Sequence, residues 1–511
     1  MIVVPNKHAW NTVKQSLYLD LLIRIESTLQ IMSLDVSPKQ FKRWIDEAAE
    51  LIASHYREHS EAKVFAGKSP AEVQELLDEP LPKESQNMGS LLDEVGEKVL
   101  STITNSAGPR YFGYITGGGN QVAVLAEMIK ASINQNNLKW HSSPASTELE
   151  RLVMRWVADF IGYPTSSAGV LLSGGSVANF NCLAVARKMK APADISDEGI
   201  YGSRPMTVYV SEEGHSSFDK AMDMLGLGKK YLRKIPVNKD FSVDIDQLEA
   251  QIRTDKNAGL HPICAIAVAG TTNTGAVDNL EAVADLCRRY DLWYHVDAAY
   301  GGPAAKVEET RHLFTGIEKA DSVVVNPHKW LYVPFEAGGV LVKNPDHLRK
   351  TFSTIPEYLK SDEQNGGRTD LMEYNLPLTK EFKALKVWMT IKAYGANRLR
   401  KEIASDMDKA RYLSQLVESD ENLEGMAPVP LSIVCFRYNP GGMEESALNS
   451  LNDQIIQEME SDGRVFLTGT KIKDKTALRV CFINPRTHKE DIQLLKKVVL
   501  EKGRQLTEEN D

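Results

Sequence analysis

Cysteine pairs, long apolar runs and an excess of positive charge are all missing from this sequence. The 511 residues include five cysteines, an odd number with no CxxC spacing, so neither a disulfide framework nor a zinc site is expected. No apolar run approaches the roughly 20 residues that cross a membrane. Lysine and arginine number 60 against 69 acidic residues, and the net charge of -9 argues against nucleic acid or an anionic membrane as the main partner.

The N-terminus also lacks the layout of a secretion signal, because Asp20, Arg24 and Glu26 interrupt any apolar core. A reducing, cytoplasmic location is therefore expected. Met32 precedes a Ser/Asp-containing stretch that resembles the start of a helix. Residues 1–31 are accordingly either an additional amphipathic helix or an extension upstream of the natural start, and both alternatives stay open.

What the sequence does contain is a pattern that changes twice along the chain. Residues 1–118 read as a helical N-terminal segment, with helices predicted in "SPKQFKRWIDEAAELIASHYREH" and "SLLDEVGEKVLSTIT". Over residues 119–385, helical segments alternate with short apolar runs, which predicts an α/β large domain built on a doubly wound, mostly parallel sheet. Residues 386–511 carry long helices and then strands, which predicts a small α+β C-terminal domain.

Polar or small residues follow each of five apolar runs in the large domain. In a doubly wound sheet, ligands bind outside the carboxyl ends of the strands, so these residues are expected to meet in one crevice. They are Gly175 and Ser176 after "AGVLL", His215 after "MTVYV", Thr272 after "PICAIAV", Asp297 and Ala299 after "LWYHV", and Asn326, His328 and Lys329 after "DSVVV".

Each of these residue types has an ordinary structural explanation when it is taken alone. A glycine-rich turn is more often only a turn, a strand-end aspartate often caps a helix, and most lysines are solvated. An arginine at a strand end, such as Arg479, is explained by an ion pair. Together, however, these groups match pyridoxal 5'-phosphate. The anion cradle suits its phosphate and the carboxylate its pyridine nitrogen, while the flat ring suits its ring face and the amine its aldehyde. That cofactor is predicted, and no metal site is predicted.

Four longer motifs carry a resemblance to a known family. The segments "HVDAAYGG", "NPHKWLYVPFEAG", "EEGHSSFDKA" and "SPASTELE" resemble the group II pyridoxal-phosphate amino-acid decarboxylases, which include the aromatic-L-amino-acid, histidine and glutamate decarboxylases. The resemblance runs from about residue 37 to the C-terminus. It implies the type I pyridoxal-phosphate-dependent transferase fold, similar to aspartate aminotransferase, and a homodimer with active sites at the subunit interface.

The resemblance also implies a role for each residue at the strand ends. Lys329 resembles the lysine that forms the Schiff base with the cofactor. Asp297 resembles the partner of the pyridine nitrogen, and Ala299 the small residue under the ring. His215 resembles the histidine that stacks on the ring. The remaining matches are Gly175 and Ser176 as phosphate ligands, Asn326 and His328 beside them, and Thr272 near the cofactor and the substrate carboxylate.

The segment "STIPEYLKSDEQNGG" resembles the mobile catalytic loop of the family. Its Tyr358 matches the tyrosine that returns a proton to the substrate carbon after carbon dioxide leaves. Relatives that release aldehydes carry a phenylalanine there. Tyr358 and His215 together therefore favour simple decarboxylation, with Lys329, Tyr358, His215 and Asp297 as the catalytic set.

The substrate is less strongly indicated. Trp330 resembles the aromatic and histidine branch, and Tyr114 is retained in "SAGPRYFGYITGGGN". However, Ser106 and Ile115 stand where the aromatic enzymes carry a tryptophan and a bulkier aromatic residue. An aromatic L-amino acid is the leading expectation, with Tyr114, Gly117 and Thr272 as candidate substrate-binding residues. The glycines at 117–119 leave open an acidic or small polar amino acid as the substrate.

Three further readings stay open beside an amine-forming decarboxylase. The first is another pyridoxal-phosphate enzyme, such as an aminotransferase or a desulfurase, which "NPHKW" and "HVDAAY" argue against. The second is a decarboxylation-dependent aldehyde synthase. The third is an inactive paralogue with a binding role, which would be expected to have lost Lys329 or Asp297, whereas this chain carries both.

Overall fold

The computed structural model describes residues 34–353 and 368–508. Two expectations lie outside these residues: the extension at residues 1–31 and the catalytic loop with Tyr358. The chain divides into two compact units, one formed by residues 1–62 and 68–103 and the other by residues 63–67 and 104–511. No helix in the described part of the chain is both long and apolar enough to cross a membrane.

In the described residues of the first unit, both predicted helical segments are helical. Its helices are α2 (Pro38–Glu58), α3 (Pro70–Leu77), α4 (Met88–Glu94) and the π-helix η1 (Val95–Leu100). The start of α2 follows from its sequence, because the Ser37 side chain accepts a hydrogen bond from the Gln40 amide and Pro38 occupies the first turn. The second predicted helix is split between α4 and η1.

The second unit is built on a seven-stranded sheet with the order β1-β7-β6-β5-β4-β2-β3. All five predicted strands are present, and β7 runs antiparallel to both of its neighbours while the other neighbouring strands pair in parallel. The strands are β1 (Ala168–Leu172), β2 (Met206–Ser211), β3 (Leu232–Ile235), β4 (His261–Val268), β5 (Trp293–Asp297), β6 (Ser322–Val325) and β7 (Gly338–Val342). The predicted mostly parallel sheet is confirmed.

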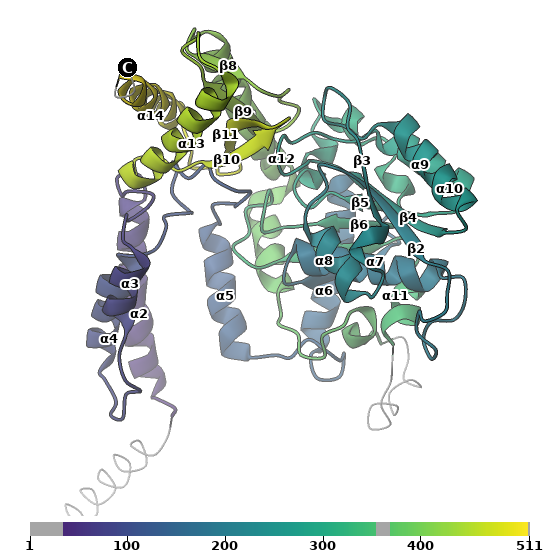
Figure 1. The fold of residues 1–511 in the computed structure, drawn as a ribbon. Helices are drawn as coiled ribbons and strands as arrows, with labels where there is room; N and C mark the ends of the chain where they lie inside the picture. The colour runs from purple at the N-terminus through teal and green to yellow at the C-terminus, as the bar shows by residue number, and fades with distance from the viewer. Residues whose placement is uncertain (1–33, 354–367, 509–511) are drawn as a thin grey trace, which may run out of the picture. The chain divides into compact units, whose positions relative to one another are not determined.

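Helices cover both faces of this sheet (Figure 1). Alternate residues of a strand point to opposite faces, so Val323 packs in one apolar cluster with α6 and α10, and Val324 packs in another with α7 and α8. The helices are α5 (Gln121–Ile133), α6 (Pro144–Ile161), α7 (Gly175–Lys190), α8 (Ser217–Met224), α9 (Ile245–Asn257), α10 (Leu280–Tyr290) and α11 (Pro345–Phe352), with short 3-10 turns η2 (Lys229–Tyr231), η3 (Gly302–Lys306), η4 (Arg311–Phe314), η5 (Ile317–Lys319) and η7 (Leu371–Tyr374).

The C-terminal part carries an antiparallel sheet with the order β10-β11-β9-β8. Its strands are β8 (Leu423–Gly425), β9 (Ile433–Tyr438), β10 (Thr468–Ile472) and β11 (Lys475–Cys481), and its helices are α13 (Glu445–Asp462) and α14 (Lys489–Glu508). Helix α12 (Ala384–Glu418) joins this part to the large sheet: Val387 packs in the core of the large sheet and Leu413 in the C-terminal core. The division at residues 385 and 386 into a large and a small domain stays a prediction.

Candidate active site

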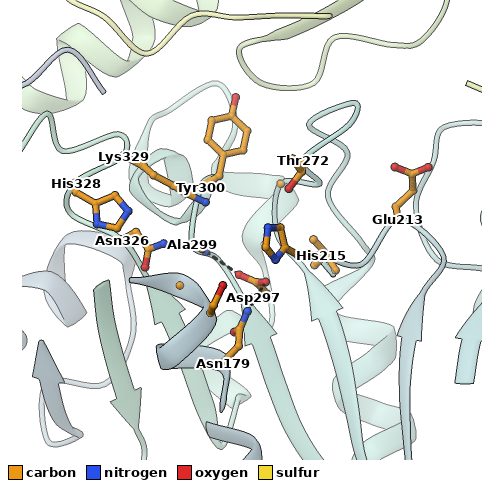
Figure 2. Close-up of a pocket in the computed structure, with 14 residues that line it drawn as sticks. Asn179, Glu213, His215, Thr272, Asp297, Ala299, Tyr300, Asn326, His328 and Lys329 are labelled. Carbon is orange, nitrogen blue, oxygen red and sulfur yellow. Dashed lines mark hydrogen bonds between the residues drawn. The ribbon is translucent and has the colours of Figure 1, made fainter. Parts of the chain in front are cut away.

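The carboxyl ends of the parallel strands surround a cavity of about 170 Å³ (Figure 2). All nine residues that the sequence predicted to bind the cofactor line this cavity. They are Gly175, Ser176, His215, Thr272, Asp297, Ala299, Asn326, His328 and Lys329. The arrangement follows from the parallel sheet, because each strand delivers the residues after its last apolar side chain to the same edge.

The anion cradle lies where β1 leads into α7. The backbone N–H groups in the first turn of this helix have no partner within the helix and favour a negative group. A Cβ atom on Gly175 would lie 2.8 Å from Nδ2 of Asn326, so a larger residue there would displace the Asn326 amide. The Oδ1 atom of Asn326 is buried and has no hydrogen-bond partner among the described residues. These features fit a phosphate group bound at this end of the cavity.

His328 lies beside the cradle as a neutral ring. Burial, with the nearby Lys329 ammonium, lowers the pKa of His328 to about 3. Its Nδ1 atom accepts a hydrogen bond of 3.0 Å from the Ala337 amide. The single proton of the neutral ring therefore lies on Nε2, which makes this nitrogen a donor for an anionic ligand.

Asp297 ends β5, and its carboxylate is held in place by two donors. Asn179 Nδ2 donates to one oxygen at 3.0 Å, and the Ala299 amide donates to the other at 3.1 Å. A carboxylate fixed in this way at the cavity wall fits the protonated pyridine nitrogen of the cofactor.

The Asn179 amide is itself oriented by His295. Burial lowers the pKa of His295 to about 4, so the ring is neutral. Ser322 Oγ accepts from Trp293 Nε1 at 2.8 Å and lies 2.8 Å from His295 Nδ1, which is the acceptor in the tautomer that carries its proton on Nε2. The proton on Nε2 of His295 then donates to Asn179 Oδ1 at 3.1 Å, which leaves the Asn179 NH₂ group facing Asp297.

Lys329 lies in a tight turn after β6 and faces the cavity. Burial lowers the pKa of Lys329, and the charge of Asp297 opposes this effect. A lysine with a lowered pKa is a better nucleophile toward an aldehyde. The next residue, Trp330, fixes the turn: its ring stacks on Tyr300 at 5.0 Å and its Nε1 donates to Asp406 at 3.0 Å.

His215 and Thr272 lie on the other side of the cavity. Burial lowers the pKa of His215, and its Nδ1 accepts from the Ser217 amide at 3.1 Å. This hydrogen bond holds the ring at the wall of the cavity. The Thr272 carbonyl accepts from Arg479 Nε at 2.6 Å.

Two predicted substrate-binding residues lie beside the cavity and do not line it. The Tyr114 carbonyl accepts from Arg479 Nη1 at 3.2 Å, and its side chain is 60% exposed. Gly117 packs against the Lys329 backbone so closely that a Cβ atom would clash with the Lys329 carbonyl oxygen. The ordinary explanation of Arg479 by an ion pair does not apply among the described residues. There its partners are backbone carbonyls and the Thr468 hydroxyl, and its buried Nη2 has no partner.

Sequence reasoning missed five residues that line the cavity. They are Asn179, Glu213, Val268, Gly270 and Tyr300. Four of them stand within or next to the motifs quoted above, so extending each strand-end motif by a few residues would have found them. Asn179 is four residues beyond Gly175 on α7, on the same side of the helix. The residues present therefore fit pyridoxal 5'-phosphate, with Gly175, Ser176, Asn326, His328, Asp297, His215 and Lys329 as its holders.

Comparisons with known proteins identify the family of this chain. The model of the pyridoxal-dependent decarboxylase conserved domain matches residues 70–439. An aromatic-L-amino-acid decarboxylase of Bacillus atrophaeus is 32% identical over 470 residues, which cover 91% of this chain and 96% of the relative. A phenylacetaldehyde synthase of Petunia hybrida is 30% identical over 479 residues, covering 91% and 94%.

A solved structure gives the same result for the fold. The crystal structure of Oryza sativa TDC with PLP and tryptamine has a TM-score of 0.88 and 27% identity, and the match covers 93% of this chain and 99% of that chain. The aspartate-aminotransferase-like fold predicted from the motifs is thereby confirmed. The chain belongs to the pyridoxal-dependent decarboxylase family, and it is a pyridoxal 5'-phosphate-dependent amino-acid decarboxylase.

Proposed function

We propose that this enzyme converts an aromatic L-amino acid to the corresponding amine and carbon dioxide. The observation that carries the proposal is the charge of the cavity wall. Among the described residues, Lys329 is the only lysine or arginine that lines the cavity, and two carboxylates, Asp297 and Glu213, line it too. A neutral side chain suits such a wall better than an acidic one, because an acidic side chain would face a like charge without a cation to pair with.

The cofactor, when bound, supplies a conjugated ring that accepts the electron pair of the breaking carbon–carbon bond. Asp297 is placed to keep a proton on the ring nitrogen, because Asn179 and Ala299 hold its carboxylate. Lys329 provides an amine of lowered pKa that is able to take up and release a proton.

We assign the amine as the product on the basis of the sequence at two positions. The resemblance associates Tyr358 with proton return to the substrate carbon, and Tyr358 and His215 together with simple decarboxylation. Tyr358 lies outside the described residues, so its placement is part of the proposal. The aldehyde synthase among the relatives is the reason to measure the product as well as substrate loss.

The test is product analysis with the purified protein loaded with pyridoxal 5'-phosphate. L-Tryptophan, L-tyrosine, L-phenylalanine, L-glutamate and L-aspartate are incubated separately. Amines and aldehydes are identified by mass spectrometry, carbon dioxide is trapped, and hydrogen peroxide is assayed. Equal amounts of aromatic amine and carbon dioxide, without peroxide, are expected. An aldehyde with peroxide would point to an aldehyde synthase, and turnover of only the acidic amino acids would contradict the aromatic assignment.

A further inference from the structure

Glu213 is a cavity residue to which neither the sequence motifs nor the family resemblance gives a role. It follows β2 and stands two residues before His215 in "SEEGHSS". It lines the same cavity as Lys329 and Asp297, and Figure 2 shows it beyond His215 and Thr272 as seen from Lys329.

The Glu213 carboxylate is held in position by one neutral donor. Asn273 Nδ2 donates to Oε2 at 3.0 Å, and the Asn273 amide is itself fixed because its Oδ1 accepts from Thr470 Oγ1 at 3.0 Å. The second oxygen, Oε1, has no hydrogen bond in the described part of the chain, and no lysine or arginine there pairs with the carboxylate. Burial raises the pKa of Glu213, and the Asn273 hydrogen bond opposes this rise because it stabilises the anion.

The other charged groups of the cavity are matched by the cofactor, and Glu213 is not. Asp297 suits the protonated ring nitrogen, and the Lys329 amine suits the aldehyde. Glu213 is therefore the one carboxylate of the described cavity lining that the cofactor leaves unmatched. Two like charges in a partly buried site repel each other more strongly than in bulk water, so a carboxylate side chain close to Glu213 would bind less tightly.

We propose that Glu213 is a specificity-determining residue that excludes amino acids with acidic side chains. The inference rests on the proposed function and deepens it, because it names the group that makes the cavity unsuitable for a second carboxylate. A neutral aromatic side chain meets no such repulsion and loses little by lying near the carboxylate.

An ordinary alternative is that Glu213 is a solvated residue at the cavity edge with no effect on the choice of substrate. The neighbouring Glu212 provides a matched control for this alternative. It is exposed, it does not line the cavity, and its Oε1 accepts only a long hydrogen bond of 3.4 Å from the Val237 amide. Glu212→Gln removes the same charge one residue away, outside the cavity.

The experiment compares the wild-type holoenzyme with its Glu213→Gln and Glu212→Gln variants. The first readout is the ratio of kcat/KM for L-glutamate to kcat/KM for L-phenylalanine. We expect Glu213→Gln to raise this ratio about tenfold or more, since it removes the repulsion and keeps the side-chain shape. Glu212→Gln is expected to change it by less than about twofold, because exposed charges are screened.

The second readout needs no turnover. Isothermal titration calorimetry measures the Kd of glutarate and of 3-phenylpropionate, and Glu213→Gln should tighten glutarate selectively. A thermal melt checks folding, and Glu213→Ser serves as a second neutral replacement. Unchanged ratios in both readouts would overturn the role of Glu213. If the wild type forms no aromatic amine, the proposed function fails, while the glutarate comparison still tests Glu213 by itself.

Discussion

At the scale of single residues, the structure shows how neighbours determine the state of each group in the site. Asp297 is surrounded by donors, and His328 and His295 are neutral because their burial disfavours the charged ring. These three residues lie in the strand-end motifs or directly beside them, so the sequence alone pointed to them. Their protonation states depend on partners such as Asn179 and Ser322, which are far away in the sequence.

The first prediction concerns Asp297. Asp297→Asn removes the charge that keeps the ring nitrogen protonated, and we expect kcat to fall about 100-fold or more. Steady-state amine formation measures the loss. Asp321→Asn is the matched control: Asp321 also accepts a backbone hydrogen bond, from Tyr294 at 2.8 Å, but it precedes β6 at the opposite edge of the sheet. An Asp297→Asn enzyme with wild-type kcat would contradict the assigned role.

At the scale of elements, the close approach of two loops positions the lysine. Gly117 lies against the turn that carries Lys329, and an added Cβ would also lie 3.0 Å from the His328 carbonyl oxygen. This approach joins two segments about 210 residues apart, so no local sequence pattern predicted it. The resemblance alone suggested that Gly117 contacts the substrate.

The second prediction follows from this packing. Gly117→Ala should displace the Lys329 turn, lower kcat by about 10-fold to 100-fold and weaken retention of the cofactor, since small misplacements of a reacting group are costly. Activity and cofactor content after gel filtration are the measurements. Gly425→Ala, on β8, is the control because its Cβ meets nothing within 4 Å. Equal effects of the two substitutions would count against the positioning role of Gly117.

The third prediction concerns pH and the His295 side chain, which links β5 to β6 and α7. The folded-state pKa of about 4 lies below the ordinary 6.5, so the unfolded chain binds the proton more readily between these values. Stability therefore falls as pH drops from about 6.5 to 4, and the loss from His295 amounts to about 3 kcal/mol. Above pH 6.5 this residue makes no pH-dependent contribution.

Thermal unfolding midpoints between pH 4 and 8 measure this effect. His295→Gln should flatten the fall of the midpoint below pH 6.5, even if its midpoint at pH 7 is lower than that of the wild type. His141→Gln, on the exposed surface, should retain the full wild-type slope. A His295→Gln protein that loses stability with the same slope would show that other groups cause the acid sensitivity.

At the scale of the whole molecule, one apolar surface has no cover among the described residues of its own unit. Leu125, Met128, Ile129 and Ile133 lie along one side of α5 and are 53%, 45%, 44% and 48% exposed. A stripe of this kind on a globular protein usually marks an interface. It agrees with the homodimer that the family resemblance predicts.

The fourth prediction is that the protein in solution has twice the chain mass of 56.9 kDa. The double substitution Leu125→Glu and Ile129→Glu should produce monomers, because charges replace apolar contacts, and activity should fall with dimer content. Light scattering after size-exclusion chromatography measures the mass. Met224→Glu is the control, since Met224 is 76% exposed on α8, away from the stripe. A monomeric and fully active wild type would contradict the dimer.

The sequence by itself determined five of the seven strands of the large sheet and the residues at their ends. Runs such as "SVVV" and "AGVLL" are continuous because both faces of a parallel strand are buried, and this pattern is local. It was absent from β3, where "LRKI" carries two charges, and from β7, which begins with two glycines, so both strands were missed. The cofactor could be predicted because these five strands each carry a cofactor-binding residue type at the carboxyl end.

Only the tertiary structure decided which groups meet across these strands. The contacts of Asn179 with Asp297, of Arg479 with Thr272 and of Gly117 with Lys329 each join segments more than 100 residues apart. Glu213 became a cavity residue only when β2 was placed in the sheet beside β4. Strand and turn preferences act between residues that are near neighbours in the sequence, so they can be predicted from it. Burial, pKa and cavity charge arise from the packing of segments that are distant in the sequence, so they need the tertiary structure.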